Sequence, residues 1–178
     1  IDLDTSAFLS NVSVYGNIAV IRSTVDVSKV VGSAYDSRPL QGQSPYVLNA
    51  GLQYKHPKDN WGMAVNLNRV GERIAIVGNI NEPDLWENSR TFLDVQVTKS
   101  FWKQKGEFKL NIQNILAEDQ IFYQNINKDV EISGVKGLVN TLFIGDKNNP
   151  NGFQSSIDDQ IWRTNFGRII SFSIAVKL

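Results

Sequence analysis

The sequence of 178 residues contains no cysteine, only one histidine, and no excess charge, since 18 basic residues balance 18 acidic ones. The lack of cysteine excludes disulfides, thiolate metal sites and cysteine nucleophiles. Balanced charge gives no sign of a nucleic-acid-binding surface or an acidic tail. No window holds the 18 or more consecutive apolar residues of a membrane helix, and Ile1–Asp4 do not begin a signal peptide. Barrel strands escape these tests, because only every second residue in them is apolar.

Six segments of the chain alternate between apolar and polar residues. A period of two is typical of strands with one apolar and one polar face. The segments are 8–26, 46–55, 61–68, 90–102, 108–113 and 162–178. Short connections (56–60 and 103–106) alternate with long ones (about 27–45, 78–89 and 127–160). This asymmetry predicts an all-β, antiparallel transmembrane β-barrel segment of about six long strands, with short turns in the periplasm and long loops outside.

Aromatic residues lie beside the short turns, each on the apolar positions of its segment. They are Phe8, Tyr54, Trp61, Phe101 and Phe108, and Leu178 holds the same level on the last segment. Amphipathic rings favour the headgroup layer, so this row predicts an aromatic girdle. A soluble sandwich has no reason to place rings at one end of every strand.

Counting from Trp61 along the third segment, the first charged residue on the apolar positions is Arg69. Counting back from Leu178 along the last segment, it is Arg168. A tilted strand crosses the hydrocarbon in about 9–11 residues, so both arginines are expected at the outer interface. Charge costs less there than the roughly 2–4 kcal/mol at mid-bilayer. Arg69 and Arg73 could contact an anionic ligand, but the expected partners are lipopolysaccharide phosphates or lumen carboxylates. Asn114 interrupts the fifth segment, which predicts a β-bulge.

Six strands are too few to close a barrel, since single-chain membrane barrels begin at about 8 strands. An open sheet in lipid leaves two edges of unsatisfied backbone groups. Residues 1–178 are therefore expected to form the C-terminal part of a larger barrel. The first and last strands need partners from residues before Ile1 or from another chain.

Four stretches carry a family resemblance that covers most of the chain from about Phe8. They are RPLQGQSPYVLNAGL at 38–52, NRVGERI at 68–74 with Val77-Gly78, ENSR at 87–90 with Leu93-Asp94, and LNIQNIL at 110–116. Together they resemble the C-terminal barrel of TonB-dependent outer-membrane receptors, particularly those of Bacteroidetes-type bacteria. Two features depart from the family. Its members usually end in an aromatic residue rather than Leu178, and the plug domain and TonB-contacting box are absent.

The resemblance implies active import across the bacterial outer membrane. In such receptors a ligand binds on the exterior, a plug inside the barrel rearranges, and TonB supplies energy from the periplasm. Their ligands include siderophores, cobalamin, glycans and peptides, and some members work with a lid-like surface lipoprotein. The expected partners are therefore outer-membrane lipid, the remaining strands and plug of the receptor, TonB and, in some members, that lipoprotein. Nucleic acid is not an expected partner.

No catalytic, cofactor-binding or metal-binding residue is expected, and the chain is not expected to be an enzyme. His56 lies in a short turn before Pro57, which favours a turn over a metal site. Residues 146–152 faintly resemble a calcium loop, but Pro150 blocks a ligand position. The adjacent acids Asp158-Asp159 and Glu118-Asp119 point to opposite faces if they lie on strands. There is no phosphate loop and no nucleophile elbow.

The apolar character of the segment 127–160 favours packing against neighbouring loops over ligand contact. Two other functions remain open at this point. One is a passive porin or surface adhesin, which would share the girdle and the loop asymmetry. The other is a soluble, carbohydrate-binding β-sandwich, in which the alternation would mark a core. The sequence does not name the transported ligand, the residues that bind it or the oligomeric state.

Overall fold

A computed structural model describes residues 9–33, 35–58, 60–125, 152–156 and 158–177. Their regular structure consists of twelve strands in three antiparallel sheets. Within these ranges, no helix is long and apolar enough to cross a membrane.

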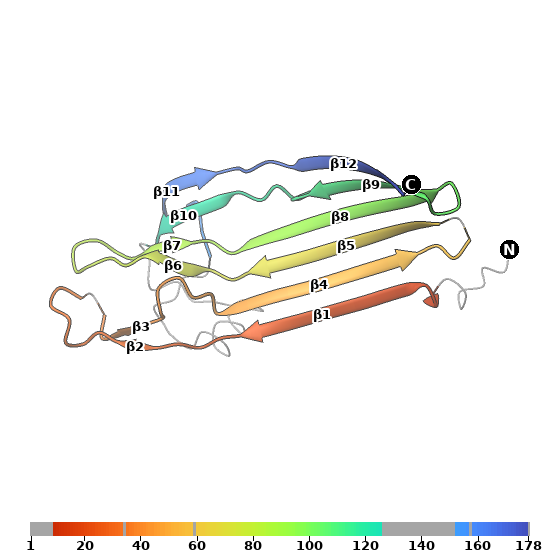
Figure 1. Cartoon of the computed structure of the whole chain (residues 1–178). Coiled ribbons are helices and arrows are strands. Elements are labelled where there is room, and N and C mark those ends of the chain that lie inside the picture. Colours follow the sequence, from red (N-terminus) through yellow and green to blue (C-terminus); the bar gives the residue numbers. More distant parts are fainter. Residues whose placement is uncertain (1–8, 34, 59, 126–151, 157, 178) are drawn as a thin grey trace.

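The largest sheet contains six long strands, which Figure 1 shows side by side in one layer. They are β1 (Val12–Val20), β4 (Tyr46–Lys55), β5 (Trp61–Val70), β8 (Arg90–Phe101), β9 (Gly106–Gln113) and β12 (Ile169–Val176). They pair in the order β1-β4-β5-β8-β9-β12, each antiparallel to its neighbour. The sheet does not close, so β1 and β12 are its edges. The predicted all-β antiparallel fold is confirmed, and the open sheet is consistent with an incomplete barrel.

The register gives this sheet one apolar and one polar face. One row of partners contains Val14, Leu52, Val65, Val95, Ile112 and Ile170. The adjacent row contains Ser13, Gln53, Ala64, Gln96, Asn111 and Ser171. Successive residues point to opposite faces, so the two rows lie on opposite sides.

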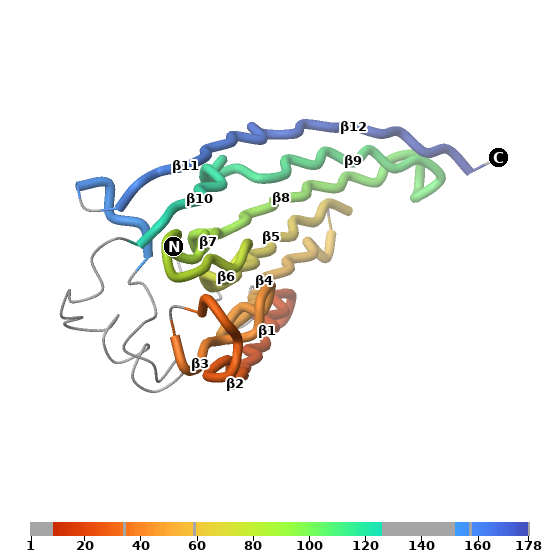
Figure 2. Tube along the Cα trace, turned by 90° about the vertical axis from the view of Figure 1, so that its left-hand side faces the viewer, coloured from red at the N-terminus to blue at the C-terminus, as the bar shows by residue number. Residues whose placement is uncertain are grey.

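Among the described residues, no second layer covers the apolar face. Leu52 is 39% exposed and Phe172 is 75% exposed, and Figure 2 shows the strands as an open arc from β12 to β1. A sandwich would bury these side chains between two sheets about 10 Å apart. The apolar face of the long sheet is therefore not the core of a soluble sandwich.

A second, four-stranded sheet lies beyond the long-loop ends of the long strands (Figure 1). Its strands are β6 (Arg73–Ile76), β7 (Leu85–Glu87), β10 (Gln120–Gln124) and β11 (Asp159–Thr164), in the order β11-β10-β7-β6. A small third sheet pairs β2 (Val25–Asp26) with β3 (Ser37–Arg38). The sequence predicted mainly loops in these regions, so the second sheet is a new feature.

Two expected segments are interrupted. The expected strand 162–178 is divided, because β11 ends at Thr164 in the second sheet and β12 begins at Ile169 in the long one. The segment 8–26 is likewise shared between β1 and β2. The expected β-bulge at Asn114 is consistent with the backbone. Asn114 has a φ of 54° and ends β9, and the Ile115 amide donates to the Leu93 carbonyl at 2.8 Å, one residue out of the register that pairs β8 with β9.

The buried hydrophobic cluster of the described chain lies in the second sheet. Ile74, Trp86 and Tyr123 come from three neighbouring strands and are almost fully buried. The ring of Phe153 packs against Tyr123 with ring centroids 5.5 Å apart. The second sheet therefore has its own packed core, whereas many apolar side chains of the long sheet are exposed.

Candidate functional site

The polar face of the long sheet carries a ladder of amide side chains across β1, β4 and β5. Asn49 Nδ2 donates to Asn17 Oδ1 at 2.9 Å, and Asn68 Nδ2 donates to Asn49 Oδ1 at 2.7 Å. Each amide can donate and accept at once, so the bonds run in one direction across the strands. The ladder joins neighbouring strands without placing charge on this face.

A hollow of about 350 Å³ opens at the short-turn end. The polar face supplies most of its lining, including Gln53, Lys55, Gln96, Thr98, Glu107 and Lys109. Lys109 Nζ lies 3.6 Å from Glu107 Oε1. This arrangement offers hydrogen-bonding groups of both kinds to a protein surface or to water.

Arg90 lies at the opposite, long-loop end of the polar face. Its guanidinium carbon is 4.4 Å from the ring centroid of Phe92 and 5.4 Å from that of Phe166. Nε and Nη1 of Arg90 are buried without a hydrogen-bond partner in the described part of the chain. Aromatic faces attract a cation but do not neutralise it. Arg90 therefore leaves a positive charge at this end of the polar face.

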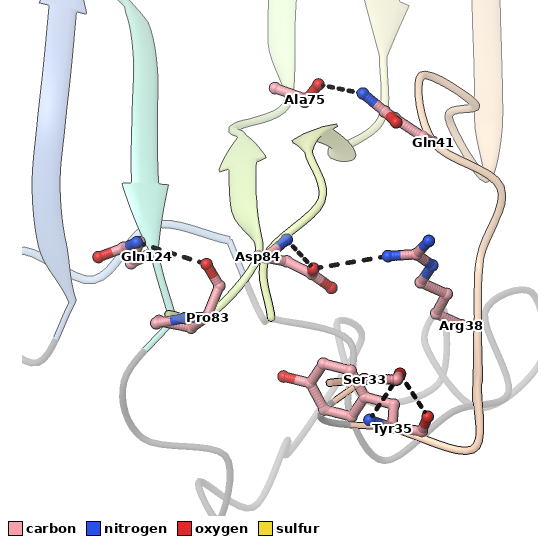
Figure 3. Close-up of polar contacts among 9 residues, drawn as sticks. Ser33, Tyr35, Arg38, Gln41, Ala75, Pro83, Asp84 and Gln124 are labelled. Atoms are coloured by element: carbon pink, nitrogen blue, oxygen red, sulfur yellow. Dashed lines mark hydrogen bonds and ion pairs between the residues drawn. The ribbon is translucent and has the colours of Figure 1, made fainter. Parts of the chain in front are cut away.

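Polar contacts tie the long connections together. Figure 3 shows Arg38 of β3 pointing at Asp84, with Nη1 of Arg38 4.0 Å from Oδ1 of Asp84. The same carboxylate oxygen accepts from the Gly78 amide at 2.7 Å. Gln41 Nε2 donates to the Ala75 carbonyl at 2.8 Å. The connection between β1 and β4 is thus fastened to the hairpin of β6 and β7.

The second sheet also contains a partly buried ion pair. Arg73 approaches Oε2 of Glu87 through Nη2 at 2.7 Å and Nε at 2.8 Å. Gln120 Nε2 donates to Oε1 of the same carboxylate at 2.7 Å. Of the two arginines expected to meet phosphates or carboxylates, Arg73 therefore meets a carboxylate.

The apolar face carries four of the expected girdle residues at the short-turn end. Tyr54, Trp61, Phe101 and Phe108 all have the apolar parity in the register. The rings of Tyr54 and Trp61 lie 5.1 Å apart. Phe8 and Leu178 lie outside the described residues. The register adds one residue to this row that the sequence did not reveal. Lys99 lies between Trp61 and Phe108, on the same face.

Both arginines expected at the outer interface lie at the long-loop end. Arg69 is on the apolar parity of β5 and donates to three hydroxyl groups, those of Tyr46, Ser89 and Thr91. Arg168 directly precedes β12, is exposed, and donates through Nε to the Ile115 carbonyl at 2.7 Å. The two arginines thus lie at the same end of the sheet but differ in their surroundings.

Comparison with known proteins gives one match. A family model described as the outer membrane protein beta-barrel family matches residues 5–136, well over half of the chain. The chain belongs to this family. Neither the curated proteins nor the solved structures contain a match to it. Its place is the bacterial outer membrane, and the alternative of a soluble sandwich is excluded.

Membership in an outer-membrane β-barrel family assigns the two faces of the long sheet. In such barrels, the outward residues form an apolar band toward lipid and the inward residues are polar. The face of Leu52 and Phe172 is therefore the lipid face. The face with the amide ladder, the hollow and Arg90 is the lumen face. By the same architecture, the short turns lie toward the periplasm and the second sheet lies on the exterior side.

The remaining sequence candidates have local structural contacts. The ring of His56 stacks on Trp61 at 5.7 Å and 15°. Glu118 Oε2 accepts from the Thr91 amide at 2.7 Å. Hydrogen bonds from Asn165 and Arg163 lower the pKa of Asp119. Asp158 Oδ2 accepts from the Gln154 amide at 2.8 Å.

No cluster of three or more metal-ligating side chains occurs among the described residues. The calcium-like segment 146–152, apart from Gly152, lies outside them, as does most of the segment 127–160.

Proposed function

We propose that this chain is the C-terminal barrel part of a TonB-dependent outer-membrane receptor that imports a nutrient. The observation that carries the proposal is the second sheet, which stands outside the membrane with a packed core of Ile74, Trp86 and Tyr123. A barrel can span the membrane without a packed core in its exterior loops. A rigid exterior platform suits a protein that must hold a ligand before moving it inward.

The lumen face supports the same proposal. Its amide ladder and its polar hollow offer hydrogen bonds to a plug domain that fills the barrel. A wide passive pore would present its wall to water along its whole length. Arg90, which lacks a carboxylate partner in the described chain, lies at the exterior end of the lumen. It would attract anionic groups of a ligand as they enter.

Several partners follow from this proposal. A plug and earlier strands would complete the receptor, TonB would act on the plug from the periplasm, and a surface lipoprotein could close over the second sheet. The ligand would be a siderophore, cobalamin, a glycan or a peptide. The receptor would move this ligand without changing it chemically.

Channel recording separates the receptor from a passive porin. The complete protein is extracted from outer membranes and inserted into planar lipid bilayers. A plugged receptor should give no steady conductance, whereas a porin should give open channels of constant size. A steady open channel in the complete protein would contradict the proposal.

Energy dependence separates the receptor from an adhesin. In cells that produce the complete protein, uptake of its ligand should stop when TonB is deleted or when the proton gradient is collapsed. Binding of the ligand at the cell surface should persist under both treatments. Uptake that continues without TonB would exclude the receptor, and binding without any uptake would indicate an adhesin.

A further inference from the structure

The lipid face carries a cluster of hydrogen-bond donors around Arg69. We propose that Arg69, together with Tyr46, Ser89 and Thr91, binds a phosphate group of an outer-leaflet glycolipid, the lipid A part of lipopolysaccharide. The inference needs only the outer-membrane barrel, so it stands whether or not the protein is a TonB-dependent receptor.

Three hydroxyl groups hold the guanidinium in place. Arg69 donates through Nε to the Tyr46 hydroxyl at 3.3 Å, through Nη1 to Thr91 Oγ1 at 2.7 Å, and through Nη2 to Ser89 Oγ at 3.0 Å. Tyr46 begins β4, Thr91 lies in β8 and Ser89 directly precedes β8. Arg69 pairs with Thr91 across the strands. The position of the guanidinium is therefore fixed from both neighbouring strands.

The cluster has unused donors and an unbalanced charge. Arginine has five N–H groups, and a hydroxyl that accepts a bond still has its own hydrogen to donate. Within the described residues, none of the three hydroxyls donates a hydrogen bond, and no carboxylate forms an ion pair with Arg69. The carboxylate of Glu118 is bonded instead to the Thr91 amide at 2.7 Å.

Phosphate is the anion that fits this set of donors. Its terminal oxygens accept several hydrogen bonds at once, and arginine binds phosphate through paired N–H groups. A single carboxylate would satisfy the guanidinium but would leave the hydroxyls without acceptors. Thr91 is only 7% exposed, so its hydroxyl positions the guanidinium from behind. The half-buried Arg69, Tyr46 and Ser89 are the groups that face a bound phosphate.

The level of the cluster in the membrane favours a lipid as the source of the phosphate. Arg69 lies eight residues from Trp61 along β5. At about 3.3 Å per residue and a tilt of about 45°, this is a rise of roughly 19 Å, toward the far side of an apolar band about 25 Å tall. The outer leaflet of the outer membrane is built from lipopolysaccharide, whose lipid A headgroup carries phosphates. A cation facing lipid at that level would meet those phosphates.

Arg168 provides a matched control on the same face. Its parity is that of Ile170, it lies at the long-loop end of β12, and it is exposed. Its one described hydrogen bond goes to the Ile115 carbonyl, and within the described residues no hydroxyl is bonded to its guanidinium. Arg168 therefore tests the attraction of charge alone, whereas Arg69 tests a built site.

The experiment measures lipid A binding to the complete protein. The protein is delipidated, placed in phosphatidylcholine nanodiscs and titrated with bis-phosphorylated lipid A, with phosphatase-treated lipid A, and with inorganic phosphate. Bound lipid is counted by native mass spectrometry. We expect R69Q to weaken binding of phosphorylated lipid A at least about tenfold, since charge-assisted hydrogen bonds are lost. R168Q should stay within about twofold of wild type.

A second variant keeps the test decisive if R69Q assembles poorly. The double variant Y46F/S89A keeps the charge of Arg69 but removes two hydroxyls, and it should weaken binding about threefold to tenfold. Equal loss in R69Q and R168Q, or full binding by Y46F/S89A, would overturn the built site. Equal binding of phosphatase-treated lipid A would overturn phosphate recognition. Displacement of the lipid by millimolar inorganic phosphate would show a free-ion site instead of a lipid site.

Discussion

The ring of Tyr15 on β1 lies across Gly51 on β4, so closely that a Cβ at position 51 would overlap the ring. From there the Tyr15 hydroxyl reaches past β4 and donates to Asn66 Oδ1 on β5. One side chain thus spans three strands of the lumen face. The absence of a side chain at Gly51 makes this reach possible.

The first prediction concerns this contact. G51A should push the Tyr15 ring aside and break its hydrogen bond to Asn66, which costs about 1 kcal/mol of unfolding free energy. Y15F removes the same hydrogen bond directly. The two effects should therefore not add in the double variant. Urea unfolding of the complete protein in lipid vesicles measures all three variants, and simple additivity would show that Gly51 and Tyr15 act independently.

The second prediction tests which face meets lipid. Val95 lies in the middle of the apolar face and its neighbour Gln96 lies on the polar face. V95R should lower the unfolding free energy by roughly 2–4 kcal/mol, because the charge enters the apolar band. Q96R adds the same charge one residue away, but to the lumen, and should stay within about 1 kcal/mol of wild type.

Both variants are compared by chemical unfolding in vesicles and by the fraction of protein that assembles in the outer membrane. If Q96R were the more damaging substitution, the two faces would be assigned the wrong way round. Since the residues are adjacent in one strand, differences in expression or local backbone structure should largely cancel.

The alternation of residues predicted the long strands well, because a strand between lipid and lumen must change polarity at every residue. The expected segment 46–55 is β4 itself. The second sheet was missed for a different reason. β10 has five residues and pairs Phe122 with Trp162, 40 positions away in the sequence. Short strands joined over such distances leave no local periodicity.

The candidate sites show the same division. The parity of Arg69 and Arg168, and their place at the long-loop end, followed from counting along single strands. The partners of Arg69 did not, because Ser89 and Thr91 reach it only through the register between β5 and β8. The surroundings of Arg90 were not predicted. The sequence around an arginine at the start of a strand does not distinguish an ion pair with a carboxylate from stacking on the rings of Phe92 and Phe166.

The third prediction concerns the contacts that fasten the exterior loops. Asp84 is 4% exposed and accepts from the Gly78 amide while facing Arg38. D84A leaves this amide without its acceptor and the guanidinium without its counter-charge, which costs about 1–3 kcal/mol locally. We expect faster cleavage of the connection between β1 and β4 by an external protease on intact cells.

A matched variant for D84A is Q41A, which removes only the bond from Gln41 to the Ala75 carbonyl. Its exposed side chain should make the effect smaller. The barrel strands should keep their resistance to protease in both variants. If D84A cells were cleaved no faster than wild type, the ion pair and the Gly78 bond would not control the loop.

The fourth prediction concerns the core of the second sheet. The side chain of Tyr123 is fully buried, and its hydroxyl has no hydrogen-bond partner in the described part of the chain. Burial raises the pKa of Tyr123, and the negative charges of Glu72 and Asp158 raise it further, so the hydroxyl stays neutral. A buried polar group without a partner costs about 1–3 kcal/mol. Y123F should therefore stabilise the second sheet by about 1 kcal/mol.

The comparison variant Y123A keeps the backbone but removes the ring that packs against Phe153. Loss of a buried aromatic ring costs about 3–5 kcal/mol, so Y123A should loosen the sheet. Hydrogen exchange of the β7 and β10 amides in the complete protein measures both effects, with slower exchange expected in Y123F and faster exchange in Y123A. Faster exchange in Y123F would mean that the hydroxyl makes a stabilising bond. Since β10 joins β7 to β11, such a bond would have to be counted among the contacts that hold the exterior platform together.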